Sequence, residues 1–148
     1  DNFGNANNAN GTFEALKRAD DAIGEALEYL QENPKTLIIT AADSEAGGME
    51  AYGFLEKDMP RDEPLPEKSK NGAPQDGING TATLPFLTGK DENGNRFPFA
   101  VAWSTSDDVY GSVVAKAEGL NAGLMNVKID YTYIYRVMYS TLFGKWLK

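Results

Sequence analysis

The sequence predicts an α/β fold, in which helices pack on a sheet. An amphipathic helical pattern over residues 12–31 is followed by an uninterrupted apolar run at residues 36–40. A β-branched apolar strand that follows such a helix is typical of a buried parallel strand. The chain has 148 residues, 41% of them hydrophobic, which suits one globular unit with a modest core.

The first helix is predicted from periodicity and from signals at both ends. Apolar residues recur at helical spacing and form one face: Phe13, Leu16, Ile23, Leu27 and Leu30. Thr12 is a suitable N-cap, and Asn33 followed by Pro34 ends the helix. The strand that follows leads into Asp43, and residues at the carboxyl ends of parallel strands face the ligand crevice.

The middle of the chain predicts a surface excursion and then a hairpin. Residues 53–80 are rich in Pro, Gly and charged residues and show little periodicity, which is typical of a long surface segment. The apolar runs 81–87 and 97–103 flank Asn93-Gly94, a strong hairpin signal. The acidic residues near this turn lack the spacing of a calcium loop, so the turn interpretation is preferred. Residues 112–116 predict another short strand.

The last predicted element is a helix over residues 130–143, with Asp130 or Thr132 as its cap. Its predicted apolar face contains four side chains: Ile134, Val137, Met138 and Leu142. We interpret its four tyrosines as packing residues rather than as a binding stripe. Two helices and few strands leave a buried parallel sheet incompletely covered, so we expect further chain to cover it.

Composition excludes several kinds of chemistry. The chain has no cysteine and no histidine, which excludes disulfides, thiolate metal sites and every histidine-based triad or zinc motif. A net charge of −8 disfavours nucleic-acid binding. No apolar run is long enough for a membrane span, and no signal peptide opens the chain. The asparagine-rich start without an initiator Met reads as a loop within a protein, so we expect a cleaved or truncated product.

Three acidic clusters lie at loops or strand ends. One begins at Asp1, a second contains Asp43 and Glu45, and a third contains Asp107 and Asp108. Carboxylates from separate segments that converge on one crevice are what a hard cation needs. Solvated loop acids produce the same pattern, so the residues alone leave both interpretations open.

The order of these segments resembles the carboxyl-terminal part of the alkaline phosphatase family. The likeness covers essentially the whole chain and includes TLIITAADSEAGG, DDVYG and YIYRVMYSTLFG. It implies a three-layer α/β/α sandwich of which this chain is the C-terminal part. Residues 1–148 would then belong to a single domain, and residues of about 50–80 would form the crown excursion of a homodimer.

The resemblance also implies metal ligands. Asp43 and Ser44 match the Asp and His of the family's Thr-Ala-Asp-His zinc signature. Asp1 and Asn5 match an Asp and a His, four residues apart, that bind the other zinc. The resemblance therefore places both Asp ligands in this chain and replaces these two histidines with oxygen donors.

The family's last zinc ligand is the His of a His-Thr-Gly sequence, which here reads Val109-Tyr110-Gly111, and Asp108 stands beside that position. The implied metal site consists of Asp1, Asn5, Asp43, Ser44 and Asp108. The implied cofactors are two or more divalent ions, zinc by family likeness. Oxygen ligands shift the preference toward magnesium, calcium or manganese.

The implied function is hydrolysis of phosphate monoesters through a phosphoenzyme. No catalytic residue is expected in this chain, because the family's nucleophile lies upstream. The implied partners are the N-terminal portion of the same enzyme, a second copy and a small phosphate ester, in the periplasm or outside the cell. The alternatives are a non-catalytic binding domain that kept the fold, or a phosphodiesterase or sulfatase of the same superfamily.

Overall fold

The computed structural model describes residues 1–53, 59–125 and 128–147. The chain divides into two compact units. Unit 1 consists of Asp1–Leu16 and Ser44–Ser112, and unit 2 consists of Lys17–Asp43 and Val113–Lys148. One boundary falls inside a helix, and another lies directly after Asp43.

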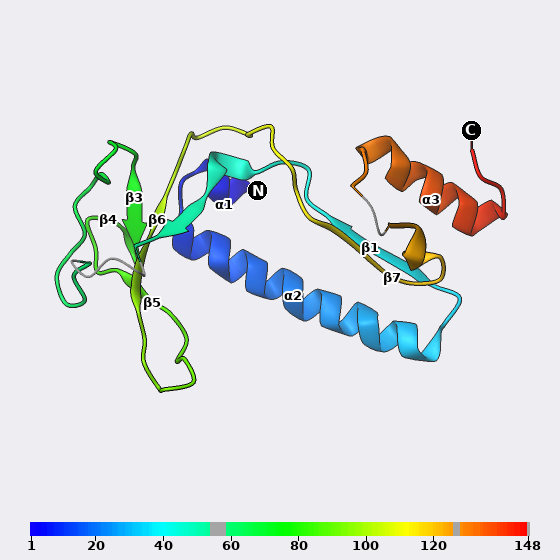
Figure 1. The fold of residues 1–148 in the computed structure, drawn as a ribbon, viewed down its shortest axis with the longest axis horizontal. Coiled ribbons are helices and arrows are strands. Elements are labelled where there is room, and N and C mark those ends of the chain that lie inside the picture. The colour runs from blue at the N-terminus through cyan, green and yellow to red at the C-terminus, as the bar shows by residue number, and fades with distance from the viewer. Residues whose placement is uncertain (54–58, 126–127, 148) are drawn as a thin grey trace. The chain divides into compact units, whose positions relative to one another are not determined.

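Figure 1 shows the helices and strands and labels most of them. Unit 1 contains the following elements and the start of the long helix α2: α1 (Asn2–Asn5), α2 (Ala9–Glu32), η1 (Ala46–Gly48), β2 (Glu50–Tyr52), β3 (Gln75–Gly77), β4 (Gly80–Thr81), β5 (Phe86–Leu87) and β6 (Pro98–Ala102). Unit 2 contains the remainder of α2 and four more: β1 (Leu37–Ala41), β7 (Ala115–Gly119), η2 (Ala122–Met125) and α3 (Tyr131–Phe143).

The sheet of unit 1 is antiparallel and is built around β6. Its described strands run in the order β2-β6-β3-β4, and β5 also pairs with β6. Phe86 lies opposite Phe99 in the β5–β6 pair, so the predicted hairpin is confirmed. Its turn carries Gly94 at φ +82°, and Asp91 accepts hydrogen bonds from the backbone of Asn93 and Asn95.

The core of unit 1 lies where α2 meets this sheet. Ala9, Val101 and Trp103 are buried in one cluster, against which Phe13 and other side chains pack. The Phe13 ring meets the Phe86 ring edge-on, with centroids 5.2 Å apart. Aromatic pairs of this kind add to the burial of apolar area. The first turns of α2 therefore pack on the sheet of unit 1 through Ala9 and Phe13.

The predicted surface excursion is partly wrong, because its last residues enter the sheet. β3 lies between β6 and β4, and all three of its residues are buried. Asp76, only 3% exposed, accepts hydrogen bonds from the Ala9 backbone N–H, the Trp103 indole and the Thr81 hydroxyl. The strand was not predicted because its sequence is polar. The Asp76 carboxylate is buried because its hydrogen bonds within the unit replace those to water. Residues 54–58 of the excursion lie outside the described residues.

Helix α2 begins earlier than predicted. It starts at Ala9, and the Asn8 side chain accepts a hydrogen bond from the Gly11 backbone at 2.9 Å, which is the role of an N-cap. Thr12, the predicted cap, instead lies in the first turn and donates to the Asn8 carbonyl. The predicted end is confirmed, since the helix ends at Glu32 and the Asn33 amide donates to the Tyr29 carbonyl.

Strand β1 pairs differently from the prediction. It runs antiparallel to β7, with Ile39 opposite Ala117, so the predicted parallel pairing is wrong for the described residues. Four of its five residues are only half-buried, because β7 is its sole partner in the described part of the chain. The strand predicted at residues 112–116 is shifted and spans Ala115–Gly119.

Helix α3 is confirmed at both ends. The Asp130 carboxylate accepts hydrogen bonds from the Thr132 and Tyr133 backbone, and Gly144 closes the helix at φ +65°. Its predicted apolar face is only partly buried. Val137 is fully buried, whereas Met138 and Leu142 are exposed. Two tyrosines of the helix, Tyr131 and Tyr135, are exposed as well, so packing accounts for only part of the tyrosine pattern.

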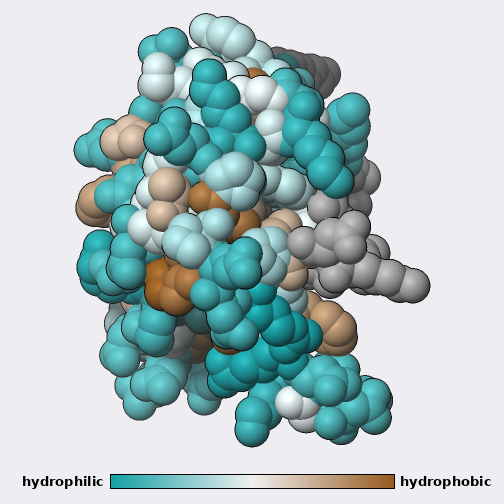
Figure 2. Space-filling view, turned by 90° about the vertical axis from the view of Figure 1, so that its left-hand side faces the viewer, coloured by the Kyte–Doolittle hydropathy of each residue, from teal (hydrophilic) through white to brown (hydrophobic). Residues whose placement is uncertain are grey.

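The fold thus mixes helices with antiparallel sheets, which fits the α/β class in its broad sense. Among the described residues, no helix combines the length and the apolar character needed to cross a membrane. The face of the molecule in Figure 2 is mainly hydrophilic, with separate small apolar patches.

Candidate functional site

Four of the predicted ligand residues meet in unit 1. The Asn5 side-chain amide donates to Asp1 Oδ1 at 3.1 Å and to Asp108 Oδ1 at 2.9 Å. The Ser44 hydroxyl donates to the same Asp108 oxygen at 3.0 Å. Three segments far apart in sequence therefore supply one cluster of polar side chains, which we call the oxygen cluster: Asp1, Asn5, Ser44 and Asp108.

The short helix α1 aligns two members of this cluster. Asp1 is its N-cap, and the Asn5 backbone N–H donates to the Asp1 carbonyl at 3.0 Å. Side chains four residues apart lie on the same face of a helix. The Asp1 carboxylate and the Asn5 amide therefore meet as a direct result of one helical turn.

Two glycines allow α1 to approach η1. A Cβ on Gly4 would lie 2.7 Å from the Ala46 carbonyl oxygen, and one on Gly47 would lie 2.3 Å from the Gly4 carbonyl oxygen. Gly47 also has φ +72°, a conformation that side chains disfavour. Only residues without a Cβ fit this close backbone contact, which sets the spacing between Asn5 and Ser44.

Backbone hydrogen bonds hold η1 against residues 104–109. The Gly47 N–H donates to the Asp107 carbonyl at 3.1 Å, and the Ser104 N–H donates to the Gly47 carbonyl at 2.9 Å. The Glu45 N–H donates to the Val109 carbonyl at 3.3 Å. These bonds involve the residues on either side of Asp108 and the residues that follow Ser44, so the backbone holds the two side chains close to one another.

The cluster stabilises the charged form of Asp108. Hydrogen bonds from the Asn5 amide and then the Ser44 hydroxyl lower the pKa of Asp108 below its ordinary value of 3.8. Hydrogen bonds donated to a carboxylate favour ionisation. Asp108 is therefore an anion through the physiological pH range, and a negative charge suits a side chain that binds a cation.

Acid titration is expected to show this shift directly. The folded-state pKa of Asp108 lies below 3.8, so the cluster stabilises the folded state at higher pH and loses this contribution as pH falls through the folded pKa. The side-chain carboxyl ¹³C resonance of Asp108 should titrate with a midpoint below 3.8. Asn5→Ala should move the midpoint toward that value. An unchanged midpoint in this variant would contradict the assigned cause.

The amide of Asn5 provides a test of whether the cluster fits a cation. Its Oδ1 is buried and has no hydrogen-bond partner among the described residues, while its Nδ2 lies between the two carboxylates. A half-turn of the amide exchanges the two atoms. Asn5 would then present its oxygen where a cation could satisfy it, in a set of carboxylate, amide and hydroxyl oxygens that suits Mg²⁺, Mn²⁺ or Ca²⁺.

The fifth predicted ligand, Asp43, belongs to unit 2, whereas the oxygen cluster belongs to unit 1. Asp43 is exposed and is the last residue of its segment of unit 2. The predicted contact between Asp43 and Asp1 stays a prediction. In the described part of the chain, no three Asp, Glu, His or Cys side chains gather as a metal group. The oxygen cluster contains two carboxylates and completes its set with Asn5 and Ser44.

A concavity of about 500 Å³ adjoins the cluster in unit 1. Its lining starts one residue beyond Ser44 and one beyond Asp108, and it is formed by Glu45, Ala46, Gly48, Met49, Glu50, Ser104 and Val109. The Ser104 hydroxyl donates to the Gly48 carbonyl. Tyr110, one residue beyond Val109, is fully exposed. The concavity therefore involves residues next in sequence to Ser44 and Asp108, but no member of the cluster lines it.

Two buried polar residues of unit 1 were not predicted from the sequence. Gln75 and Asp76 are both buried, yet they lie in the segment predicted as a surface excursion. The short strand that carries them shows no alternation of apolar and polar residues, so no periodic signal marks it.

Comparison of the chain with protein-family models, curated proteins and solved structures gave no match.

Proposed function

We propose that this chain is the C-terminal portion of a metal-dependent phosphomonoesterase of the alkaline phosphatase type. The observation that supports it is the meeting of Asp1, Asn5, Ser44 and Asp108, which the resemblance selected as ligands. The Asn5 amide and the Ser44 hydroxyl, which come from separate segments, both donate to Asp108 Oδ1. The three-layer sandwich, the homodimer and the location outside the cytoplasm belong to the same proposal.

In this proposal the oxygen cluster holds a divalent ion. Asp1 and Asp108 supply its charge, and Asn5 and Ser44 supply neutral oxygens; Asp43 is assigned as a further ligand by the resemblance. Such an ion, when bound, neutralises charge on a phosphate ester and activates an oxygen nucleophile. Oxygen ligands of this kind suit Mg²⁺, Mn²⁺ or Ca²⁺.

Titration with Mn²⁺ tests the site. We expect Mn²⁺ to broaden the amide resonances of Asn5, Ser44 and Asp108, and Asp108→Asn to weaken binding at least about ten-fold because it removes an anionic ligand. Asp107→Asn is the matched control, since it removes the adjacent charge but leaves the cluster intact. Equal weakening by both substitutions, or broadening elsewhere, would mean that Mn²⁺ follows general negative charge rather than this site.

The enzymatic part of the proposal needs a separate assay. The full-length gene product should hydrolyse p-nitrophenyl phosphate with at least one ion among Mg²⁺, Mn²⁺, Ca²⁺ and Zn²⁺. Mn²⁺ binding without turnover by any of these ions would reject the phosphatase and favour the non-catalytic binding domain. The hydrogen bonds with which Asn5 links both carboxylates favour this second function, because they close the cluster without a cation.

A further inference from the structure

Four Asn-Gly pairs occur in this chain, and each contains the residues that spontaneous deamidation needs. They are Asn10-Gly11, Asn71-Gly72, Asn79-Gly80 and Asn93-Gly94. Glycine has no side chain to hinder its backbone nitrogen, so this nitrogen can attack the neighbouring asparagine amide within the same chain. The sequence gives all four pairs the same chemistry, and the structure distinguishes them by exposure, packing and hydrogen bonds.

The reaction consumes only water. The backbone nitrogen of the glycine bonds to the side-chain carbonyl carbon of the asparagine, and the bond from that carbon to Nδ2 breaks. The amide nitrogen leaves as ammonia with the proton that the backbone nitrogen loses. Water then opens the cyclic imide at either carbonyl and leaves an aspartate or an isoaspartate, so each event adds a negative charge.

The first pair is enclosed at the start of α2. Gly11 is buried, and a Cβ on it would lie 2.5 Å from Phe3 Cδ1. The Gly11 N–H donates to Asn8 Oδ1 at 2.9 Å, and the Asn10 amide donates to Glu14 Oε1 at 3.3 Å. Because the attacking nitrogen is buried and bonded within a helix, we expect Asn10 to be the least reactive of the four asparagines.

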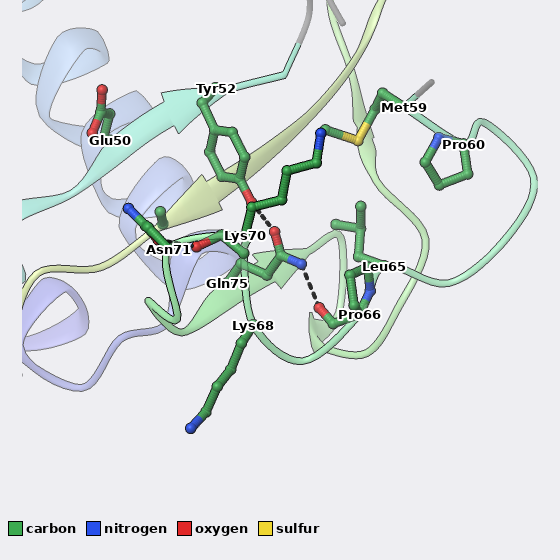
Figure 3. Close-up of a pocket in the computed structure, with 12 residues that line it drawn as sticks. Glu50, Tyr52, Met59, Pro60, Leu65, Pro66, Lys68, Lys70, Asn71 and Gln75 are labelled. Atoms are coloured by element: carbon green, nitrogen blue, oxygen red, sulfur yellow. Dashed lines mark hydrogen bonds between the residues drawn. The ribbon is translucent and has the colours of Figure 1, made fainter. Parts of the chain in front are cut away.

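The second pair is held by its own turn. Asn71 Oδ1 accepts hydrogen bonds from the Ser69 hydroxyl and the Ala73 N–H. The Gly72 N–H donates to the Ser69 carbonyl at 2.9 Å. Figure 3 shows Asn71 on this turn, among the residues that line a concavity beside β3. Both the amide that would be attacked and the nitrogen that would attack it are therefore engaged.

The third pair belongs to the sheet of unit 1. Gly80 lies in β4, where it pairs with Gly77 of β3, and it is half-buried. The Asn79 N–H donates to the Thr83 hydroxyl at 3.2 Å. Attack by the Gly80 nitrogen has to disturb this strand pair, so we expect the sheet to slow the reaction at Asn79.

The fourth pair lies at the exposed turn between β5 and β6. Every residue from 91 to 97 is exposed, and a Cβ on Gly94 would meet nothing within 4 Å. In the described part of the chain, the Asn93 side chain makes no hydrogen bond. The Asn93 amide is therefore open to attack, and no strand pair or helix has to be disturbed.

A single acidic residue holds this turn closed. Asp91 Oδ1 accepts hydrogen bonds from the Asn95 N–H at 2.7 Å and the Asn93 N–H at 2.9 Å. The Asp91 carbonyl accepts the Gly94 N–H at 3.0 Å. The hydrogen bond from the Asn95 backbone is the main cause that lowers the pKa of Asp91 below 3.8, so the carboxylate is charged at neutral pH. The turn has to open before the Gly94 nitrogen can attack.

From these contrasts we propose that Asn93 is the site at which the folded chain deamidates first, and that Asp91 sets the rate by holding the turn closed. The product places a negative charge beside the Asp91 carboxylate, which repels it. An isoaspartate also adds a carbon atom to the backbone of the turn. This site is separate from the oxygen cluster and does not depend on the phosphatase proposal.

Peptide mapping by mass spectrometry of the folded chain, incubated at neutral pH, tests the site. We expect Asn93 to be modified at least about ten-fold faster than Asn10, and before Asn71 and Asn79. In urea the four asparagines should react at similar rates, because the contacts that distinguish them are lost. Earlier modification of another pair in the folded chain would overturn the proposal, and so would the same lead for Asn93 in urea.

Two neighbouring acids test the control by Asp91. Asp91→Ala removes the acceptor of the Asn93 and Asn95 N–H groups and should raise the rate at Asn93 about ten-fold. Glu92→Ala is the matched control, since it removes the adjacent charge but leaves those hydrogen bonds intact. Equal rates in the two variants would reject the assigned role of Asp91. If Asp91→Ala fails to fold, the order of the four pairs in the wild-type chain still decides the site.

Discussion

Asp76→Ala is expected to lower the free energy of unfolding by about 3 kcal/mol or more. The carboxylate is 3% exposed and accepts hydrogen bonds from Ala9 N at 3.2 Å and Trp103 Nε1 at 3.3 Å, with Thr81 Oγ1 on its other oxygen. Alanine leaves the two buried N–H groups without acceptors, and each such loss costs about 1–3 kcal/mol. The Ala9 N–H is also one of the free donors at the start of α2, so the change weakens the docking of the helix.

Urea unfolding followed by far-UV circular dichroism measures this loss. Asp76→Asn, which keeps one acceptor oxygen, should lose about half as much. Asp62→Ala, an exposed acid of the same unit, should stay within about 0.5 kcal/mol of the wild-type chain. If Asp76→Ala stayed equally close, Asp76 would not be an organising residue of the core.

Gly47→Ala is expected to combine a stability loss of about 3 kcal/mol with disruption of the oxygen cluster. The new Cβ would lie 2.3 Å from the Gly4 carbonyl oxygen and 3.0 Å from Trp103 Cε3, at φ +72°. The left-handed conformation costs about 1 kcal/mol and overpacking about 1–3 kcal/mol. Because η1 must move away from α1, Ser44 and Asn5 should separate, and the proposed Mn²⁺ affinity should fall at least about ten-fold.

Gly72→Ala separates the cost of the left-handed conformation from the cost of overpacking. Gly72 has φ +86°, but a Cβ there meets nothing within 4 Å, so this variant should lose only about 1 kcal/mol and keep the cluster. Urea unfolding reports stability, and the Asn5 side-chain amide resonances report the cluster. If Gly47→Ala lost no more stability than Gly72→Ala and kept those resonances, the close backbone contact would have no part in positioning the site.

Local signals in the sequence predicted the regular elements well. The end of α2, the Asp130 cap of α3 and the β5–β6 hairpin depend on neighbouring residues: Pro34, a capping carboxylate and Asn93-Gly94. Interactions of this range are encoded within a few positions. The start of α2 was missed by three residues because Asn8 and Thr12 are both suitable caps, and only the packing of Ala9 and Gly11 distinguishes them.

The candidate site depends both on the sequence and on tertiary contacts. Within unit 1, the segment order and the resemblance selected Asp1, Asn5, Ser44 and Asp108, but no local pattern states that Asn5 reaches a residue 103 positions away. That contact depends on Gly4 and Gly47, which allow two backbones to touch. The burial of Gln75 had no signal in the sequence, since it arises from the pairing of β3 with β6.

The sequence by itself determined which residues can carry chemistry: without histidine or cysteine, only oxygen donors and amines remain. It also determined α2, α3 and the β5–β6 turn, because these follow from periodicity, capping and turn residues within a few positions. Tertiary structure alone decided that β1 pairs antiparallel with β7 and that Asp76 is buried beneath α2. Strand partners and buried carboxylates depend on what lies across space, and neither periodicity nor composition records that.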